Sequence, residues 1–184
     1  LNANTQETCQ VSAWLRHCGY LLWQTGCARY ADMMERAIYN RLLVAQEPYR
    51  GDWAYWLPLQ DHARMVFGYA WDDPNFTIAD RLAGRYYCCD GFGSLSIAEL
   101  PRWVAAWDDH GLWINLYVAG EVRWVHNGKP LTLIVETDYP KSEHVAMVFC
   151  ASQPVRLNLR LRIPAWLARH PVVEVNGEAA GARL

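Results

Sequence analysis

Four side chains in two separate parts of the chain have the chemistry of a metal site. Glu7 and Cys9 stand two residues apart near the beginning, and Cys88 and Cys89 are adjacent further along. One carboxylate and three thiols make four potential ligands, which is the number that zinc prefers, and thiolates select zinc over magnesium or calcium. We therefore consider Glu7, Cys9, Cys88 and Cys89 as candidate ligands of Zn²⁺.

These cysteines also have a plainer interpretation. The spacing is not that of a zinc knuckle, and nothing in the local sequence forces the two segments together. A lone cysteine is usually a small buried hydrophobic residue, and we expect Cys18, Cys27 and Cys150 to be core residues. Cys88 and Cys89 precede a glycine-bearing turn and a predicted helix, whose dipole would stabilise a thiolate. A metal site and a set of buried thiols both remain open.

Composition limits the class of protein. With 184 residues, of which 52% are hydrophobic and 20% charged, the chain can bury a core. A net charge of -2 without a basic run argues against nucleic acid or an anionic membrane as partner. No apolar run reaches the roughly 18 residues of a membrane helix. The 10 Trp and 10 Tyr residues would serve either a core or a carbohydrate cleft, because aromatic rings stack on sugars.

Cysteine usage bears on the compartment. Six cysteines in a chain of this length are sparse for a secreted disulfide scaffold, and the adjacent pair would close a strained ring. Free thiols or metal ligands are therefore expected instead of disulfides. Together with the lack of a visible signal peptide after Leu1, this favours the cytoplasm.

Hydrophobic periodicity predicts that the first part of the chain is helical. Apolar residues recur every three or four positions from about 6 to 25 and again from about 28 to 45, which predicts two antiparallel helices. A third helix is predicted to begin at Ser94 and to reach about Trp107, with an interruption at Pro101. For residues 60–85 the sequence pattern predicts neither a helix nor a strand.

The second part of the chain has the alternating pattern of β-strands. The predicted strands are 112–118, 121–125, 131–137, 145–151, 155–163 and 172–175. Asn127-Gly128 predicts a tight hairpin turn between two of them. Helices followed by strands indicate an α+β chain, with a helical domain at residues 1–107 and a β domain at residues 108–184.

Several short segments also resemble, in one order, those of a known enzyme family. They are Glu7-Thr8-Cys9, Arg29 to Asn40, Cys88-Cys89, Gly111 to Tyr117, Glu136 to Pro140, and Leu161 to Trp166 followed by Val175-Asn176-Gly177. The set resembles glycoside hydrolase family 127, the β-L-arabinofuranosidases and their close relatives. The resemblance implies the C-terminal part of an (α/α)6 barrel followed by the start of an antiparallel β-sandwich.

The resemblance also implies roles for individual residues. The four candidate ligands would bind Zn²⁺, and Cys88 would be the nucleophile of a retaining hydrolase that acts on β-L-arabinofuranosides or related plant-derived glycosides. Tyr55 would help to hold the sugar. The general acid/base would be a glutamate before Leu1, so we expect this chain to be a fragment that is inactive alone.

Two other functions remain open at this stage. The cysteines and Glu7 could form a structural zinc site without catalysis. The aromatic content and the β domain could instead belong to a carbohydrate-binding module. The chain departs from the family pattern at Leu57 and at Asp90-Gly91-Phe92-Gly93, beside the cysteine pair, which leaves the identity of the sugar open.

Overall fold

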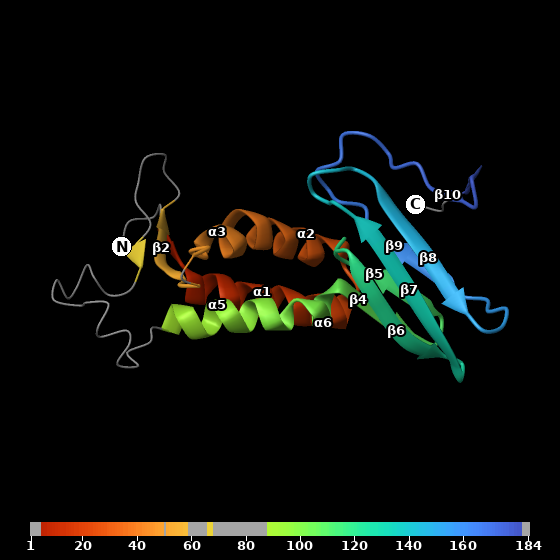
Figure 1. Ribbon diagram of the computed structural model, residues 1–184, viewed down its shortest axis with the longest axis horizontal. Coiled ribbons are helices and arrows are strands. Elements are labelled where there is room, and N and C mark those ends of the chain that lie inside the picture. Colours follow the sequence, from red (N-terminus) through yellow and green to blue (C-terminus); the bar gives the residue numbers. More distant parts are fainter. Residues whose placement is uncertain (1–4, 50, 59–65, 68–87, 182–184) are drawn as a thin grey trace.

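The computed structural model describes residues 5–49, 51–58, 66–67 and 88–181. Its helices precede most of its strands, so the chain is a mixed α+β protein, as the sequence predicts. The helices lie side by side, with a small sheet at one end and the larger sheets at the other (Figure 1). Among the described residues, none of the helices combines the length and hydropathy that a bilayer-spanning segment needs.

Helix α1 (Thr8–Thr25) confirms the first predicted helix and has a defined beginning and end. Glu7 and Gln10 form a capping box at its N-terminus, which satisfies amide groups that lack helical partners. Gly26 ends it in the left-handed conformation, with φ of 63° and its N–H donating to the carbonyl of Leu22 at 2.8 Å. The buried apolar positions follow the helical period: Val11, Leu15, Cys18 and Leu22.

The second predicted helix is present but is not regular throughout. Helix α2 (Ala28–Ala37) runs into a π-helical turn, η1 (Ile38–Leu42), and then into α3 (Leu43–Ala45). Its buried residues pack on α1 to form one hydrophobic core. The two segments form the predicted αα-hairpin.

The third helix differs from its prediction at both ends. Helix α5 is described over Cys88–Glu99, so Ser94 lies inside the helix and is not its N-cap. Its hydroxyl accepts the indole N–H of Trp53 instead. The predicted interruption is present, and α6 (Pro101–Val104) follows. The helix then ends before Trp107, because strand β4 (Ala105–Asp108) pairs with β5 (Gly111–Ile114).

The strands form four small sheets. Strands β1 (Thr5–Glu7), β2 (Ala54–Pro58) and β3 (Val66–Phe67) make the first, and β3 is the described part of the stretch 60–85. The second has the order β4-β5-β9, with β9 at Asn158–Leu161. The third contains β6 (Gly120–His126), β7 (Lys129–Thr137) and β8 (Val145–Ala151), and the fourth β10 (Glu174–Val175) and β11 (Glu178–Ala179).

Turn chemistry explains two of these pairings, and a third differs from the rest in direction. Asn127 and Gly128 have φ of 50° and 76°, as the type I′ turn predicted between β6 and β7 requires. Asn176 and Gly177 also have positive φ, of 54° and 83°, in the turn between β10 and β11. Strand β9 is shorter than predicted and pairs with β5 in parallel, whereas the other described pairings are antiparallel.

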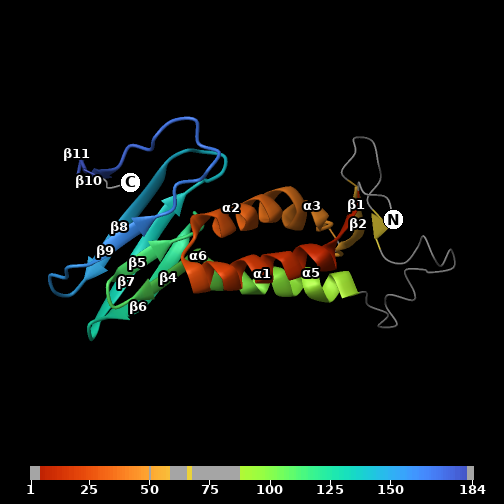
Figure 2. The same cartoon turned by 180° about the vertical axis from the view of Figure 1, so that it is seen from behind.

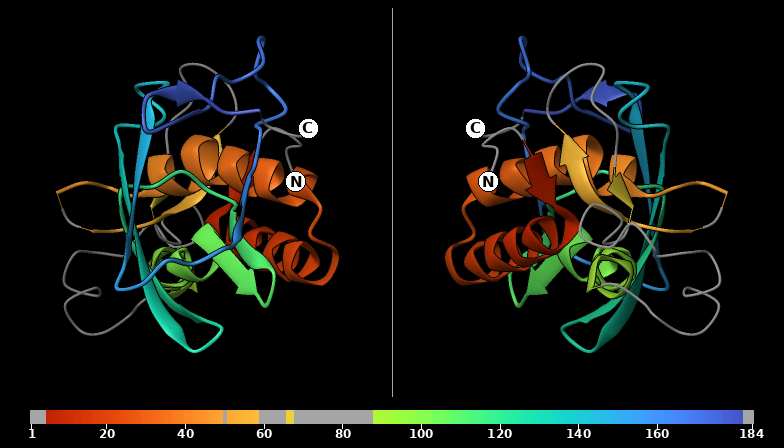
Figure 3. Two further views of the ribbon diagram at one scale, coloured as in Figure 1. Left: turned by 90° about the vertical axis from the view of Figure 1, so that its right-hand side faces the viewer. Right: turned by 90° about the vertical axis from the view of Figure 1, so that its left-hand side faces the viewer.

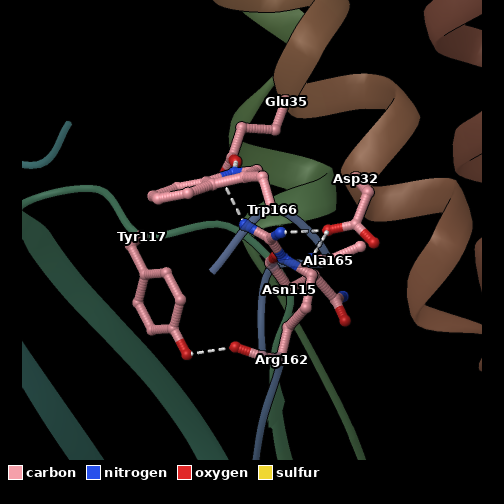
Figure 4. A network of polar contacts seen from close by, with 7 residues as sticks. All are labelled: Asp32, Glu35, Asn115, Tyr117, Arg162, Ala165 and Trp166. Atoms are coloured by element: carbon pink, nitrogen blue, oxygen red, sulfur yellow. Dashed lines mark hydrogen bonds and ion pairs between the residues drawn. The ribbon is translucent and has the colours of Figure 1, made fainter. Parts of the chain in front are cut away.

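A buried ionic network joins the helices to the strands, and the two parts are seen from behind in Figure 2. Arg162 follows β9, and its guanidinium donates to Asp32 Oδ1 at 2.6 Å, to Glu35 and to the carbonyl of Asn115 (Figure 4). Trp166 adds an indole N–H to Glu35 Oε1 at 2.8 Å. The alternation over the predicted strand 155–163 assigns Arg162 to its polar face, yet Arg162 is buried, because α2 supplies two carboxylates there.

We predict that Arg162→Met lowers the free energy of unfolding by roughly 3–5 kcal/mol, because it leaves the carboxylates of Asp32 and Glu35 without their buried cation. The exposed pair of Arg123 and Glu121 provides the control, and Arg123→Met should cost less than about 1 kcal/mol. Urea unfolding followed by circular dichroism measures both. Equal losses would contradict a special role for the buried network.

Candidate metal centre

The structure brings the four candidate ligands together at one end of the helices. Glu7 is the last residue of β1, Cys9 lies in the first turn of α1, and Cys88 and Cys89 open α5. Their ligand atoms all lie within 4.8 Å of one another. The right-hand view of Figure 3 looks along the helices from this end, and it shows β1 and β2 beside the helix ends. Residues some 80 positions apart therefore form one cluster.

The spacing of these atoms fits a tetrahedral zinc ion. Tetrahedral coordination with usual bond lengths separates two sulfur ligands by about 3.8 Å, and a sulfur from a carboxylate oxygen by about 3.6 Å. The Sγ atoms of Cys9 and Cys89 are 3.5 Å apart. Glu7 Oε1 lies 3.5 Å from Cys88 Sγ and 3.9 Å from Cys89 Sγ. Both the donor set and its dimensions suit this ion.

Burial keeps two of the thiols neutral when no cation is present. It raises the pKa of Cys89 to about 12, and it also raises the pKa of Cys9, with further contributions from hydrogen bonds to Cys88 and Glu7. A divalent cation reverses this preference, because thiolate ligation displaces the protons. The N-termini of α1 and α5 both point their dipoles at the cluster and favour negative charge there.

The cluster is accessible on one side. Cys88 is exposed, Glu7 and Cys9 are half-buried, and Cys89 is buried. Tyr55 of β2 lies close enough that burial and the charge of Glu7 raise its pKa, so its phenol stays protonated. The structure thus places the predicted sugar-binding tyrosine beside the exposed cysteine.

Helices α1 and α5 carry the ligands and pack closely along their length. The hydroxyls of Ser12 and Ser96 lie 2.8 Å apart in the buried contact, and Arg16 Nε lies 2.7 Å from Glu99 Oε2 at its edge. Further along, a Cβ on Gly19 would lie 2.7 Å from the ring of Trp103, so only glycine allows this approach. The two helix N-termini are held together by this packing.

The other cysteines lie apart from the cluster and differ among themselves. Cys18 is fully buried in the core, as predicted. Cys27 and Cys150 are exposed, so the prediction that they belong to the core is wrong. Cys27 precedes α2 as its N-cap, and Cys150 lies on the outer strand β8. All six cysteines are free thiols.

Sequence reasoning missed the roles of two residues next to the ligands. Thr8 donates its hydroxyl to the carbonyl of Ala54 at 2.5 Å, and Asp90 Oδ1 accepts the backbone N–H of Trp53 at 3.1 Å. Thr8 and Asp90 each directly follow a ligand, which is the only signal in the sequence that could have singled them out.

Family models match both parts of the chain. The model described as the β-L-arabinofuranosidase GH127 catalytic domain matches residues 1–102, which is more than half of the chain. The chain belongs to glycoside hydrolase family 127. The model of the GH127 middle domain matches residues 111–183, so the helical part corresponds to the catalytic domain of the family and the strands to its middle domain.

Solved structures of family members share the fold. A GH127 β-L-arabinofuranosidase from Geobacillus stearothermophilus T6 is 23% identical with a TM-score of 0.75, over 95% of this chain and 27% of its own. A structure described as a GH127 β-arabinofuranosidase is 24% identical with a TM-score of 0.75, over 97% and 28%. The chain therefore spans less than a third of the length of these relatives. A search of curated proteins found no match.

We predict that zinc binding to the intact protein strengthens as pH rises. The raised pKa values of Cys9 and Cys89 mean that both thiols are protonated at neutral pH without metal. Each proton that the metal displaces makes the affinity rise about tenfold per pH unit, so two thiols give about 100-fold. Competition with a chelator between about pH 6.5 and 7.5 measures this slope.

A control variant tests whether the slope belongs to this cluster. Cys150→Ser removes an exposed thiol of β8 and should leave both the affinity and its pH dependence unchanged. An affinity that does not vary with pH would show that buried, protonated thiols are not the ligands.

Proposed function

We propose that the protein is a zinc-dependent retaining glycoside hydrolase that cleaves β-L-arabinofuranosides or related plant-derived glycosides. The observation that carries the proposal is the convergence of Glu7, Cys9, Cys88 and Cys89 in a chain whose first 102 residues match the family's catalytic domain. The similar solved structures are β-arabinofuranosidases, which supports the class of substrate.

The four residues of the cluster would hold the metal. Their three sulfurs and one carboxylate oxygen are the donors that zinc prefers, and their distances suit tetrahedral coordination. Bound zinc would keep the thiols deprotonated near neutral pH, where burial alone would protonate Cys9 and Cys89.

Cys88 is proposed as the nucleophile because it is the exposed sulfur of the cluster. Its thiolate would donate an electron pair to the anomeric carbon, and the bond to the leaving oxygen would break as a general acid protonates that oxygen. Water would then displace the sulfur from the same carbon, returning the proton to the base and restoring the thiolate. Two inversions give net retention.

Other parts of the chain would position the substrate. Tyr55 lies beside the cluster on β2 and could hold the sugar by a hydrogen bond from its protonated phenol. We further propose that the helical domain, residues 1–107, is part of an (α/α)6 barrel and that the β domain, residues 108–184, belongs to a β-sandwich.

We predict that Cys88→Ser in the intact protein lowers kcat for aryl β-L-arabinofuranosides by roughly 10³-fold or more, because the hydroxyl is a much weaker nucleophile than a thiolate. Cys27→Ser is the matched control, since it changes an exposed thiol outside the cluster. Initial rates of phenol release measure both variants. Unchanged hydrolysis by Cys88→Ser would exclude this residue as the nucleophile.

A structural zinc site is the second candidate, because four protein ligands can complete a closed tetrahedral site. It differs from the first in what it predicts for the wild-type protein. An intact protein that binds one zinc ion tightly, yet hydrolyses no aryl furanoside or pyranoside, would favour the structural site. The exposure of Cys88 is the observation against it.

A further inference from the structure

Two hydrogen bonds meet at the beginning of strand β2. The hydroxyl of Thr8 donates to the carbonyl of Ala54 at 2.5 Å, and Thr8 is 1% exposed and Ala54 fully buried. One residue earlier, the backbone N–H of Trp53 donates to the carboxylate of Asp90 at 3.1 Å. Two consecutive residues of one segment are thus held from two different helices.

Both of the side chains that hold β2 are neighbours of the ligands in the sequence. Thr8 stands between Glu7 and Cys9 at the start of α1, and Asp90 directly follows Cys88-Cys89 at the start of α5. A short covalent path therefore connects each hydrogen bond to one pair of ligand atoms.

We propose that Thr8 and Asp90 are positioning residues that set the spacing of the metal ligands by fastening both ligand pairs to Trp53 and Ala54. The inference rests on the proposed metal centre and adds to it. The pairing of β1 with β2, the indole of Trp53 on α5 and the helix packing further along also relate the two ligand pairs, but the contacts of Thr8 and Asp90 are the ones made directly beside the ligands.

Trp53 is suited to be the shared anchor because it cannot shift easily. Its side chain is 1% exposed, and its indole N–H donates to the hydroxyl of Ser94 at 3.2 Å. A Cβ on Gly93 would lie 2.1 Å from its ring, so the backbone of α5 is in direct contact with the indole. Asp90, Gly93 and Ser94 lie three and four positions apart on one face of α5, and together they enclose this one side chain.

The same anchor also determines where Tyr55 lies. Tyr55 directly follows Ala54, whose carbonyl accepts the hydrogen bond from Thr8, so these contacts also restrict the backbone that carries Tyr55. The contacts that hold the ligands therefore also limit how far the backbone of the proposed sugar-binding tyrosine can move relative to Cys88.

Metal affinity in the intact protein tests this inference. Cobalt(II) serves as the spectroscopic probe, since its thiolate charge-transfer and visible bands report tetrahedral ligation, and chelator competition gives the zinc affinity. Thr8→Val and Asp90→Ala should each weaken zinc by about 10- to 100-fold, as is typical when residues that orient ligands are removed. Thr8→Ser and Asp90→Asn keep an oxygen in place and should remain within about threefold of the wild type.

Ser12→Ala is the matched control for general loss of helix packing. Ser12 is 1% exposed and its hydroxyl joins α1 to α5 through Ser96, one helical turn beyond Thr8. The Ser12→Ala substitution should lower stability without changing the cobalt spectrum or the zinc affinity. If Thr8→Val does not fold, Asp90→Ala, whose side chain is only half-buried, carries the test.

The outcomes separate the two proposals. A wild-type protein that binds neither zinc nor cobalt overturns the metal centre and this inference with it. A wild-type protein that binds metal while Thr8→Val and Asp90→Ala bind it equally well overturns only the inference. An equal loss of affinity in Ser12→Ala does the same, because the effect would then be one of overall packing.

Discussion

The contact of α1 and α5 with the start of β2 is the constraint on which the rest of the site depends. Each helix brings two ligands, and neither pair alone is a metal site. The buried ring of Trp53 and the carbonyl of Ala54 give both helix N-termini one common reference. Because backbone and buried side chains carry these contacts, the four ligand atoms have little freedom to move apart.

Opposing effects act on the protonation of the thiols in the cluster. Burial of Cys89 and partial burial of Cys9 disfavour the thiolate forms, while two helix dipoles and a divalent cation favour them. Cys88 differs because it is exposed, and a substrate can reach it. One cluster can therefore hold a metal with its inner sulfurs and present its outer sulfur for chemistry.

At the opposite end, the helices are joined to the sheets by other contacts. Two separate hydrophobic clusters form, one among the helices and β2 and one among the strands. Arg162 joins the two parts by binding Asp32 and Glu35 of α2 and the carbonyl of Asn115. Loss of one partner of such a network leaves a buried charge unpaired, so the network disfavours arrangements in which the two parts do not meet in this way.

The sequence by itself determined the features that depend on local pattern. Periodicity and glycine positions predicted α1, the αα-hairpin and the turn at Asn127-Gly128, because these depend on residues close in the chain. Ligand chemistry and the family resemblance together selected the four residues of the cluster. Pattern also misled at two places, the start of α5 and the strand β4.

Only the tertiary structure decided which distant residues meet. No local pattern shows that Glu7 and Cys9 approach Cys88 and Cys89, because helix packing and the contacts to β2 set that distance. The same holds for Arg162, which alternation assigns to a polar face and which α2 buries with two carboxylates. Which side chains are buried, and which residues far apart in the sequence contact one another, depends on the packing of the whole fold.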